Sequence, residues 1–312
     1  MKNSDFIQMT QCAMYSIKFP HDKFVETIET ASYPDRGDGF SVEVIKNPLT
    51  GNKVQLLGDG YFFTLRVNYK KFSKEMLTAK VAELKTLLDK AFTANWTAKE
   101  FIEQAKSSLK IEAPASSEEM NVFYSPSKEL LIVNKNSKNC RIALSLLIES
   151  FGLAGFRSVV VSDEKLGLTT RLQRYLADFT PMFKHLHFEH EATLSKRNGD
   201  DESHLLCRHL DDEEKRKKAV EALEDEYRVQ STAMCFDNGL FRVDFKLTGN
   251  LKIRSMKFFE YSDVARQLNN PKTADKSAVM LEYLGQQFEA LLKIAESTVL
   301  EFVDGTKLEG FV

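Results

Sequence analysis

Two consecutive amphipathic helices are predicted between residues 73 and 110, and they constrain the fold more than any other feature. The first carries an apolar stripe at helical spacing, formed by Leu77, Val81, Leu84 and Leu88. Thr97 and Glu100 form a capping box that begins the second helix. Its own stripe consists of Phe101, Ala105 and Leu109. A break at residues 94–95 makes the pair a helical hairpin, whose apolar faces must pack on each other and on something else.

Strand-forming sequence surrounds this hairpin. The expected elements before it are strands at 10–18, 40–46, 53–57 and 60–70 and a helix at 21–31. After it we expect a linker at 111–119 and then a β-β-α-β unit. That unit comprises strands at 122–124 and 130–133, a helix from an N-cap at Ser137 to Gly152, and a strand at 158–161.

The last part of the chain begins with a short helix that we expect Thr169 to cap. The elements expected after it are a hairpin of 183–194 with 203–210, a helix at 211–226, strands at 227–236, 239–247 and 251–259, and a helix at 276–302. The predicted fold class is therefore α+β, with mixed, mainly antiparallel sheets and a helical-hairpin tip.

Composition narrows the class of protein. The 312 residues are 43% hydrophobic and include 23 Phe, which excludes a mainly disordered chain. Lys and Arg number 43 and Asp and Glu 45, so the net charge of −2 argues against a polycation. Nucleic-acid binding is not excluded, because it needs local rather than total charge.

Cysteine usage and hydropathy indicate the compartment. The cysteines Cys12, Cys140, Cys207 and Cys235 form no CxxC pair, so we expect reduced thiols. The first twenty residues lack the apolar core of a secretory signal, and no run of apolar residues could span a membrane. We therefore expect a soluble cytoplasmic protein without a membrane partner.

Two clusters offer catalytic or metal chemistry, each with a plainer interpretation. Histidines crowd near Cys207 at positions His185, His187, His190, His204 and His209. Two of them on one strand face would allow a metal site, but half-exposed strand histidines without a metal are commoner and no HExxH spacing is present. The acids Asp211, Asp212, Glu213 and Glu214 complement the dipole at the start of a helix. Neither a P-loop nor a GxSxG elbow is present, so we expect no metal, no cofactor and no catalytic constellation.

Charge is segregated along the chain. In the late strands Arg242, Lys246, Lys252, Arg254 and Lys257 accompany only Asp244. Arg242 and Lys246 share one strand face, and Lys252 and Arg254 share a face of the neighbouring strand. Cations in such a row could contact successive phosphates of a nucleic acid, although the solvated face of an amphipathic sheet has the same pattern. Acids are concentrated instead in the stretch 200–226.

The order of these segments resembles the recombination-associated protein RdgC family of bacterial DNA-binding proteins. The resemblance covers nearly the whole chain. It rests on Gly60–Arg66, Ala79–Leu84, Leu130–Asn134, the helix start at Leu168-Thr169, the meander Val229–Phe258 and the long C-terminal helix.

The resemblance implies a centre domain (1–72 and 119–162), a helical tip domain (73–118) and a base domain (163–312). It implies that two subunits close into a ring around double-stranded DNA with little sequence preference. It further implies nucleoid association and restraint of a RecA-type recombinase. The family also carries an exonuclease label, for which this sequence shows no residues. The alternatives are therefore a DNA exonuclease, or a protein-interaction inhibitor that uses the acidic stretch 200–226.

The resemblance also places the DNA contacts. The contact segment of the base domain falls on Cys207-Arg208-His209, with Arg208 as the phosphate ligand. At the tip, Glu112-Ala113-Pro114 stand where the family has an arginine and a phenylalanine, although Lys106 and Lys110 lie close by. A Trp-x-Pro-Pro stretch expected near 32–60 is also absent. The candidate DNA-binding residues are Arg208, His209, Lys252, Arg254, Arg242, Lys246, Lys106 and Lys110.

Overall fold

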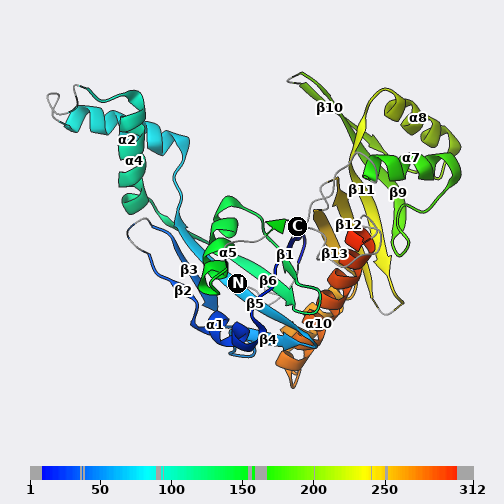
Figure 1. Cartoon of the computed structure of the whole chain (residues 1–312), viewed down its shortest axis with the longest axis horizontal. Coiled ribbons are helices and arrows are strands. Elements are labelled where there is room, and N and C mark those ends of the chain that lie inside the picture. Colours follow the sequence, from blue (N-terminus) through cyan, green and yellow to red (C-terminus); the bar gives the residue numbers. More distant parts are fainter. Residues whose placement is uncertain are drawn as a thin grey trace.

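The protein is a mixed α+β structure with antiparallel sheets, which confirms the predicted class (Figure 1). No helix of the described chain is long and apolar enough to cross a membrane. The computed structural model describes residues 9–35, 37, 39–88, 93, 95–153, 157–158, 167–199, 201–239, 241–249 and 252–300.

An eight-stranded sheet forms the middle of the molecule. Its strands are β1 (Ala13–Ser16), β2 (Ser32–Tyr33), β3 (Ser41–Ile45), β4 (Val54–Leu57), β5 (Gly60–Lys70), β6 (Ala115–Ser125), β7 (Leu130–Val133) and β8 (Arg157–Ser158). They are ordered β2-β3-β5-β6-β7-β1-β8, and β4 pairs with β5. Successive side chains of β5 point to opposite faces, so that Phe62 enters one core while Phe63 and Leu65 enter another. The second core is closed by α1 (Phe24–Thr30) and α5 (Lys138–Ser150).

A five-stranded sheet follows, in the order β10-β9-β11-β12-β13. The strands are β9 (His187–Asn198), β10 (Asp201–Cys207), β11 (Arg228–Asp237), β12 (Arg242–Thr248) and β13 (Ile253–Phe258). Apolar residues of its inner face pack with α7 (Leu168–Asp178), α8 (Glu213–Glu224) and α10 (Lys276–Ala295). The opposite face, called the outer face below, carries the charged side chains of the strands.

Helix α10 joins the two sheets. Its Phe288 stacks on Phe123 of β6 with ring centroids 5.4 Å apart, and its Tyr283 contacts Phe258 of β13 at 6.2 Å. A Cβ at Gly60 would collide with the Phe288 ring, so glycine at the start of β5 permits this close approach. The two sheets and α10 consequently share one apolar core.

The predicted helical hairpin is confirmed as α2 (Lys74–Leu87) and α4 (Ala98–Glu112). Thr97 and Glu100 form the expected capping box. Leu84, Phe101 and Ala105 make a small separate core between the two helices. Leu87 and Ile111 remain 71% and 70% exposed, so part of the apolar surface of the hairpin is uncovered in the single chain.

Several local predictions were wrong. Residues 111–119 are not a linker, because α4 continues to Glu112 and the first residues of β6, from Ala115, pair with the end of β5 at Lys70. Thr169 does not cap α7, which begins after Gly167; the Thr169 hydroxyl is buried and accepts a hydrogen bond from the Val229 amide at 3.0 Å.

The predicted element ends also shift. The region 21–31 divides into a 3₁₀ turn, η2 (His21–Lys23), and α1. The helix predicted to reach residue 302 ends at Ala295 and continues as a π-helical turn, η3 (Glu296–Leu300). An additional helix, α9 (Tyr261–Asn269), was not predicted. Of the strand predicted at 158–161, only residue 158 lies within the described residues, in β8.

Candidate nucleic-acid interface

The outer face of the five-stranded sheet arises from strict alternation along β12. Val243, Phe245 and Leu247 are buried against the helices, while Arg242 and Lys246 point to the outer face and remain partly exposed. The predicted shared face of Arg242 and Lys246 is therefore confirmed. Lys246 lies directly across from Arg254 of β13, which places two cations side by side. Neighbouring like charges are unfavourable in a sheet unless an anion lies nearby.

Carboxylates from β9 neutralise part of this face. Glu191 accepts a hydrogen bond from the Lys246 ammonium at 2.9 Å and another from Arg208 Nε at 3.1 Å. The hydrogen bond from Lys246, together with the positive charge of Arg208, holds the pKa of Glu191 below its ordinary value although burial opposes the shift. Lys246 and Arg208 therefore already have an anionic partner within the chain.

Arg242 is similarly engaged. Its Nε donates to Asp244 at 3.1 Å, and its outer guanidinium nitrogen lies 3.4 Å from Glu189. The guanidinium also lies 5.1 Å from the centre of the exposed Phe259 ring. We call the three cations Arg208, Arg242 and Lys246, with their partners Glu189, Glu191 and Asp244, the paired cluster.

The sequence did not predict Glu189 and Glu191 as partners of these cations, because Asp244 is the only acid among the basic residues of the late strands. These carboxylates come from β9, which is separated from β12 by β11. The residues of β11 between them on the outer face, Ala233 and Cys235, are small, so long side chains can meet across that strand. Only the strand order reveals this contact.

A different arrangement occurs where β13 meets the eight-stranded sheet. A hollow of about 230 Å³ is lined by Lys252 and Arg254 together with Lys135 and Ser137 at the start of α5. Arg254 also lines a neighbouring hollow of about 580 Å³, with Lys246, Thr248 and Ser231. No carboxylate among the described residues lines either hollow. We call Lys135, Lys252 and Arg254 the open cluster; within the described chain none of them is in an ion pair.

The other candidates lie elsewhere. His209 follows β10 in a loop with a φ of +56°, and its carbonyl accepts from the amide of Asp212, the N-cap of α8. Lys106 and Lys110 belong to α4 in the tip hairpin, at the opposite end of the molecule from the five-stranded sheet (Figure 1). Lys106 is paired with Glu103 at 2.8 Å, whereas Lys110 is exposed. The chain therefore does not bring all eight candidates together.

The tip differs at residue 112 from the pattern that the resemblance implies, and this residue contacts the other tip helix. Glu112, which stands where the resemblance implies an arginine or phenylalanine, binds the Lys80 ammonium at 2.8 Å. This pair joins the end of α4 to α2, and the same ammonium also donates a hydrogen bond to the Glu83 carboxylate at 3.1 Å. Residue 112 thus links the two tip helices to each other.

The histidines do not converge on a metal site. His190 contacts the Tyr175 hydroxyl at 2.8 Å on the inner side, while His204 lies 4.0 Å from Glu202 on the exposed hairpin. Among the described residues, one set of three possible metal ligands has all its ligand atoms within 4.8 Å of one another, and it consists of Glu189, Cys235 and Asp244. Burial raises the pKa of Cys235 to about 12, and Arg242 already bonds both carboxylates. This group is accordingly an ion-pair network around a protonated thiol.

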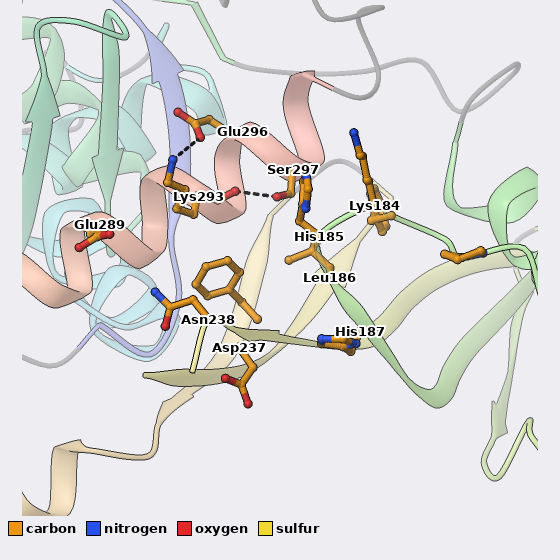
Figure 2. A pocket seen from close by; sticks show the side chains of 13 residues that line it. Lys184, His185, Leu186, His187, Asp237, Asn238, Glu289, Lys293, Glu296 and Ser297 are labelled. Atoms are coloured by element: carbon orange, nitrogen blue, oxygen red, sulfur yellow. Dashed lines mark hydrogen bonds and ion pairs between the residues drawn. The ribbon is translucent and has the colours of Figure 1, made fainter. Parts of the chain in front are cut away.

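A further hollow of about 920 Å³ lies between the five-stranded sheet and the end of α10 (Figure 2). Lys184, His185 and His187 line one side, and Glu289, Lys293 and Glu296 line the other. Burial tends to raise the pKa of Glu296, but hydrogen bonds from Lys128 and Lys293 bring it below its ordinary value. Because carboxylates line this hollow and Lys293 is paired with Glu296 at 3.1 Å, it is less suited to a phosphate than the open cluster.

Comparison with known families found no family model that matches this sequence, and comparison with curated proteins found no matching sequence.

Proposed function

We propose that the protein binds the phosphate backbone of double-stranded DNA without sequence preference, and that the open cluster is the centre of this contact. The single observation that carries the proposal is the convergence of Lys135, Lys252 and Arg254 on hollows that no described carboxylate lines. Cations without an internal partner release bound counterions on meeting a phosphate, and this release drives non-specific DNA binding.

The surroundings suit a phosphate rather than a base edge. The hydroxyl of Ser231 and the amide of Asn134 line these hollows, beside Ser137 and Thr248, whose hydroxyls already donate to Glu118 and to the Lys252 carbonyl. Hydroxyl, amide and backbone N–H groups are common partners of phosphate oxygens, and they position a duplex without reading its sequence. The paired cluster would contribute less, because its cations must first give up Glu191, Glu189 or Asp244.

The active form in this proposal is a homodimer that encloses the duplex. The tip hairpin and the five-stranded sheet stand at the two ends of an arc, with the eight-stranded sheet between them (Figure 1). Two arcs that join at both ends would surround DNA. The uncovered Leu87 and Ile111 support an apolar contact at the tip end.

By occupying DNA on the nucleoid, such a dimer would restrain recombination by a RecA-type recombinase. The test is a strand-exchange reaction with the protein added at increasing concentration, beside a direct measurement of duplex binding. We expect binding to fall steeply with salt, with a log–log slope of about −0.9 for each phosphate contacted. Inhibition should follow the fraction of DNA that is occupied.

Several outcomes would contradict this proposal. Salt-insensitive binding, or no binding to duplex at low salt, would remove its electrostatic basis. Inhibition by a variant that no longer binds DNA would indicate a protein-interaction inhibitor instead. Shortening of labelled duplex that depends on Mg²⁺ or Mn²⁺ and persists through further purification would favour the exonuclease alternative.

A further inference from the structure

Strand β10 is an edge strand of the five-stranded sheet. Within the described chain it pairs only with β9, and its residues from Asp201 to Leu206 are exposed. The β9–β10 hairpin projects past α7 and α8 at the top of Figure 1. An edge of this kind presents unpaired N–H and C=O groups that another strand can bind.

Other sheet edges are covered or short. At β13, the opposite edge of the same sheet, the Cys12 amide donates to the Ile253 carbonyl at 2.9 Å and the Met256 amide donates to Thr10 at 2.8 Å. The edge strands β2 and β8 of the larger sheet have two residues each. By contrast, β10 keeps an unbroken register with β9 along its length and contains neither the lysine nor the proline that often protect an edge.

The charges along β10 are complementary to those of a second, antiparallel β10. The strand begins with the acids Asp201 and Glu202, and the residue after its end is Arg208. Between them Leu205 and Leu206 are 38% and 48% exposed. Antiparallel pairing places the acidic beginning of one copy against the basic end of the other, whereas parallel pairing would set like charges together.

We propose that β10 pairs antiparallel with β10 of a second copy, with the two-fold axis at Leu205. In this register Glu202 lies opposite Arg208 of the second copy, His204 lies opposite Leu206, and the two Leu205 side chains face each other. Each pair shares one sheet face, as antiparallel pairing requires: Leu205 lies on the face of the buried Leu194, while Leu206 shares the face of Thr193. The two five-stranded sheets become continuous across the dimer.

This inference rests on the homodimer of the proposed function and names one of its two contact surfaces. It does not depend on DNA, because backbone pairing and the Glu202–Arg208 contacts occur between protein chains alone. Arg208 can serve both Glu191 and Glu202 of the second copy, since a guanidinium has five N–H donors.

Disulfide trapping tests the register. In a Cys207→Ser background, Leu205→Cys should form an intersubunit disulfide under mild oxidation, because directly opposed strand residues have Cα atoms about 4.5–5.5 Å apart. Ser203→Cys lies opposite Cys207 of the second copy in this register. It should therefore cross-link while Cys207 is present and fail to cross-link in the Cys207→Ser background. Cys12, Cys140 and Cys235 are buried and are retained throughout.

Charge exchange provides a second measurement, made by sedimentation without DNA. Glu202→Lys and Arg208→Glu should each weaken the dimer, and the double variant should restore it. A monomeric wild-type protein would overturn the inference, and so would a dimer in which Leu205→Cys does not cross-link. A dimer that cross-links as expected but does not bind DNA would leave this inference standing and remove only the proposed function.

Discussion

The paired cluster and the open cluster meet where Lys246 of the first lies across from Arg254 of the second, but they differ in what surrounds their cations. Glu189, Glu191 and Asp244 already bond the cations of the paired cluster. No described carboxylate lines the hollows of the open cluster. Basic residues at equivalent places on one sheet are therefore not equally available to a ligand.

The physical difference lies in the exchange that each cation undergoes. A lysine that leaves a carboxylate for a phosphate replaces one charge-assisted hydrogen bond with another, so the net gain is small. An unpaired lysine releases only water and counterions. The comparison predicts that binding energy is concentrated at the edge of the sheet near β13.

The largest expected effect follows from removing the open cluster. Lys252→Ala combined with Arg254→Ala should weaken duplex binding about 100-fold, because a hydrogen bond to a charged group contributes about 1.5 kcal/mol or more. The log–log salt slope should become shallower by about 2, since two phosphate contacts are lost. Binding isotherms at several salt concentrations, with two unrelated duplex sequences, measure both quantities.

Lys217→Ala is the matched control for this variant. Lys217 is an exposed lysine of α8 whose ammonium contacts Glu213, and both side chains are about 70% exposed. Its removal should leave affinity and salt slope unchanged. If Arg242→Ala combined with Lys246→Ala weakened binding more than the open-cluster variant, the comparison would be reversed.

A smaller effect of opposite sign is expected at Glu191. Glu191→Gln removes the negative charge that holds Lys246 and Arg208, so duplex binding should strengthen by up to about fivefold, the equivalent of a pair worth about 1 kcal/mol. The measurement is the same binding isotherm at low salt. Unchanged affinity would show that the paired cluster does not face DNA.

The alternation of apolar and charged residues in the sequence was enough to predict much of the five-stranded sheet. The alternation of Val243, Phe245 and Leu247 with charged residues determined which side chains of β12 are buried, and the confirmed hairpin stripes depend on spacing in the same way. These features are local, because each is determined by the geometry of one helix or one strand.

Contacts between distant segments could not be predicted in this way. Glu191 reaches Lys246 because β9 and β12 flank the same strand, which requires the strand order. Thr169 resembles a helix cap in sequence, but the neighbouring Val229 amide determines its role. The predicted linker at 111–119 is partly strand because β5 is long enough to pair with it.

The tip hairpin also has one exposed and one paired lysine, so the same comparison can be made there with smaller expected effects. Lys110 is exposed, whereas Lys106 is bonded to Glu103. If the tip contacts DNA, Lys110→Ala should reduce affinity by about twofold to threefold and Lys106→Ala by less, since exposed charges contribute about 0–1 kcal/mol. Equal effects of the two variants in the binding isotherm would contradict the importance of internal pairing.

The smallest effect concerns stability and pH. Because its contacts with Lys246 and Arg208 hold the pKa of Glu191 below its ordinary value, the ionised form stabilises the fold above the unfolded-state pKa of about 4.3. That contribution is lost as pH falls through the lower pKa of the folded protein. Glu191→Gln should therefore reduce the free energy of unfolding by up to about 1 kcal/mol at neutral pH and by less in acid.

Urea titrations of both proteins at neutral and acidic pH measure this difference. Glu213→Gln is the control, because its partner Lys217 and the carboxylate itself are both largely exposed and water screens their interaction. Its effect on unfolding should be smaller and depend more strongly on salt. A Glu191→Gln difference that did not shrink in acid would show that the carboxylate is not stabilised by its cationic neighbours. The paired cluster would then be as open to a phosphate as the open cluster.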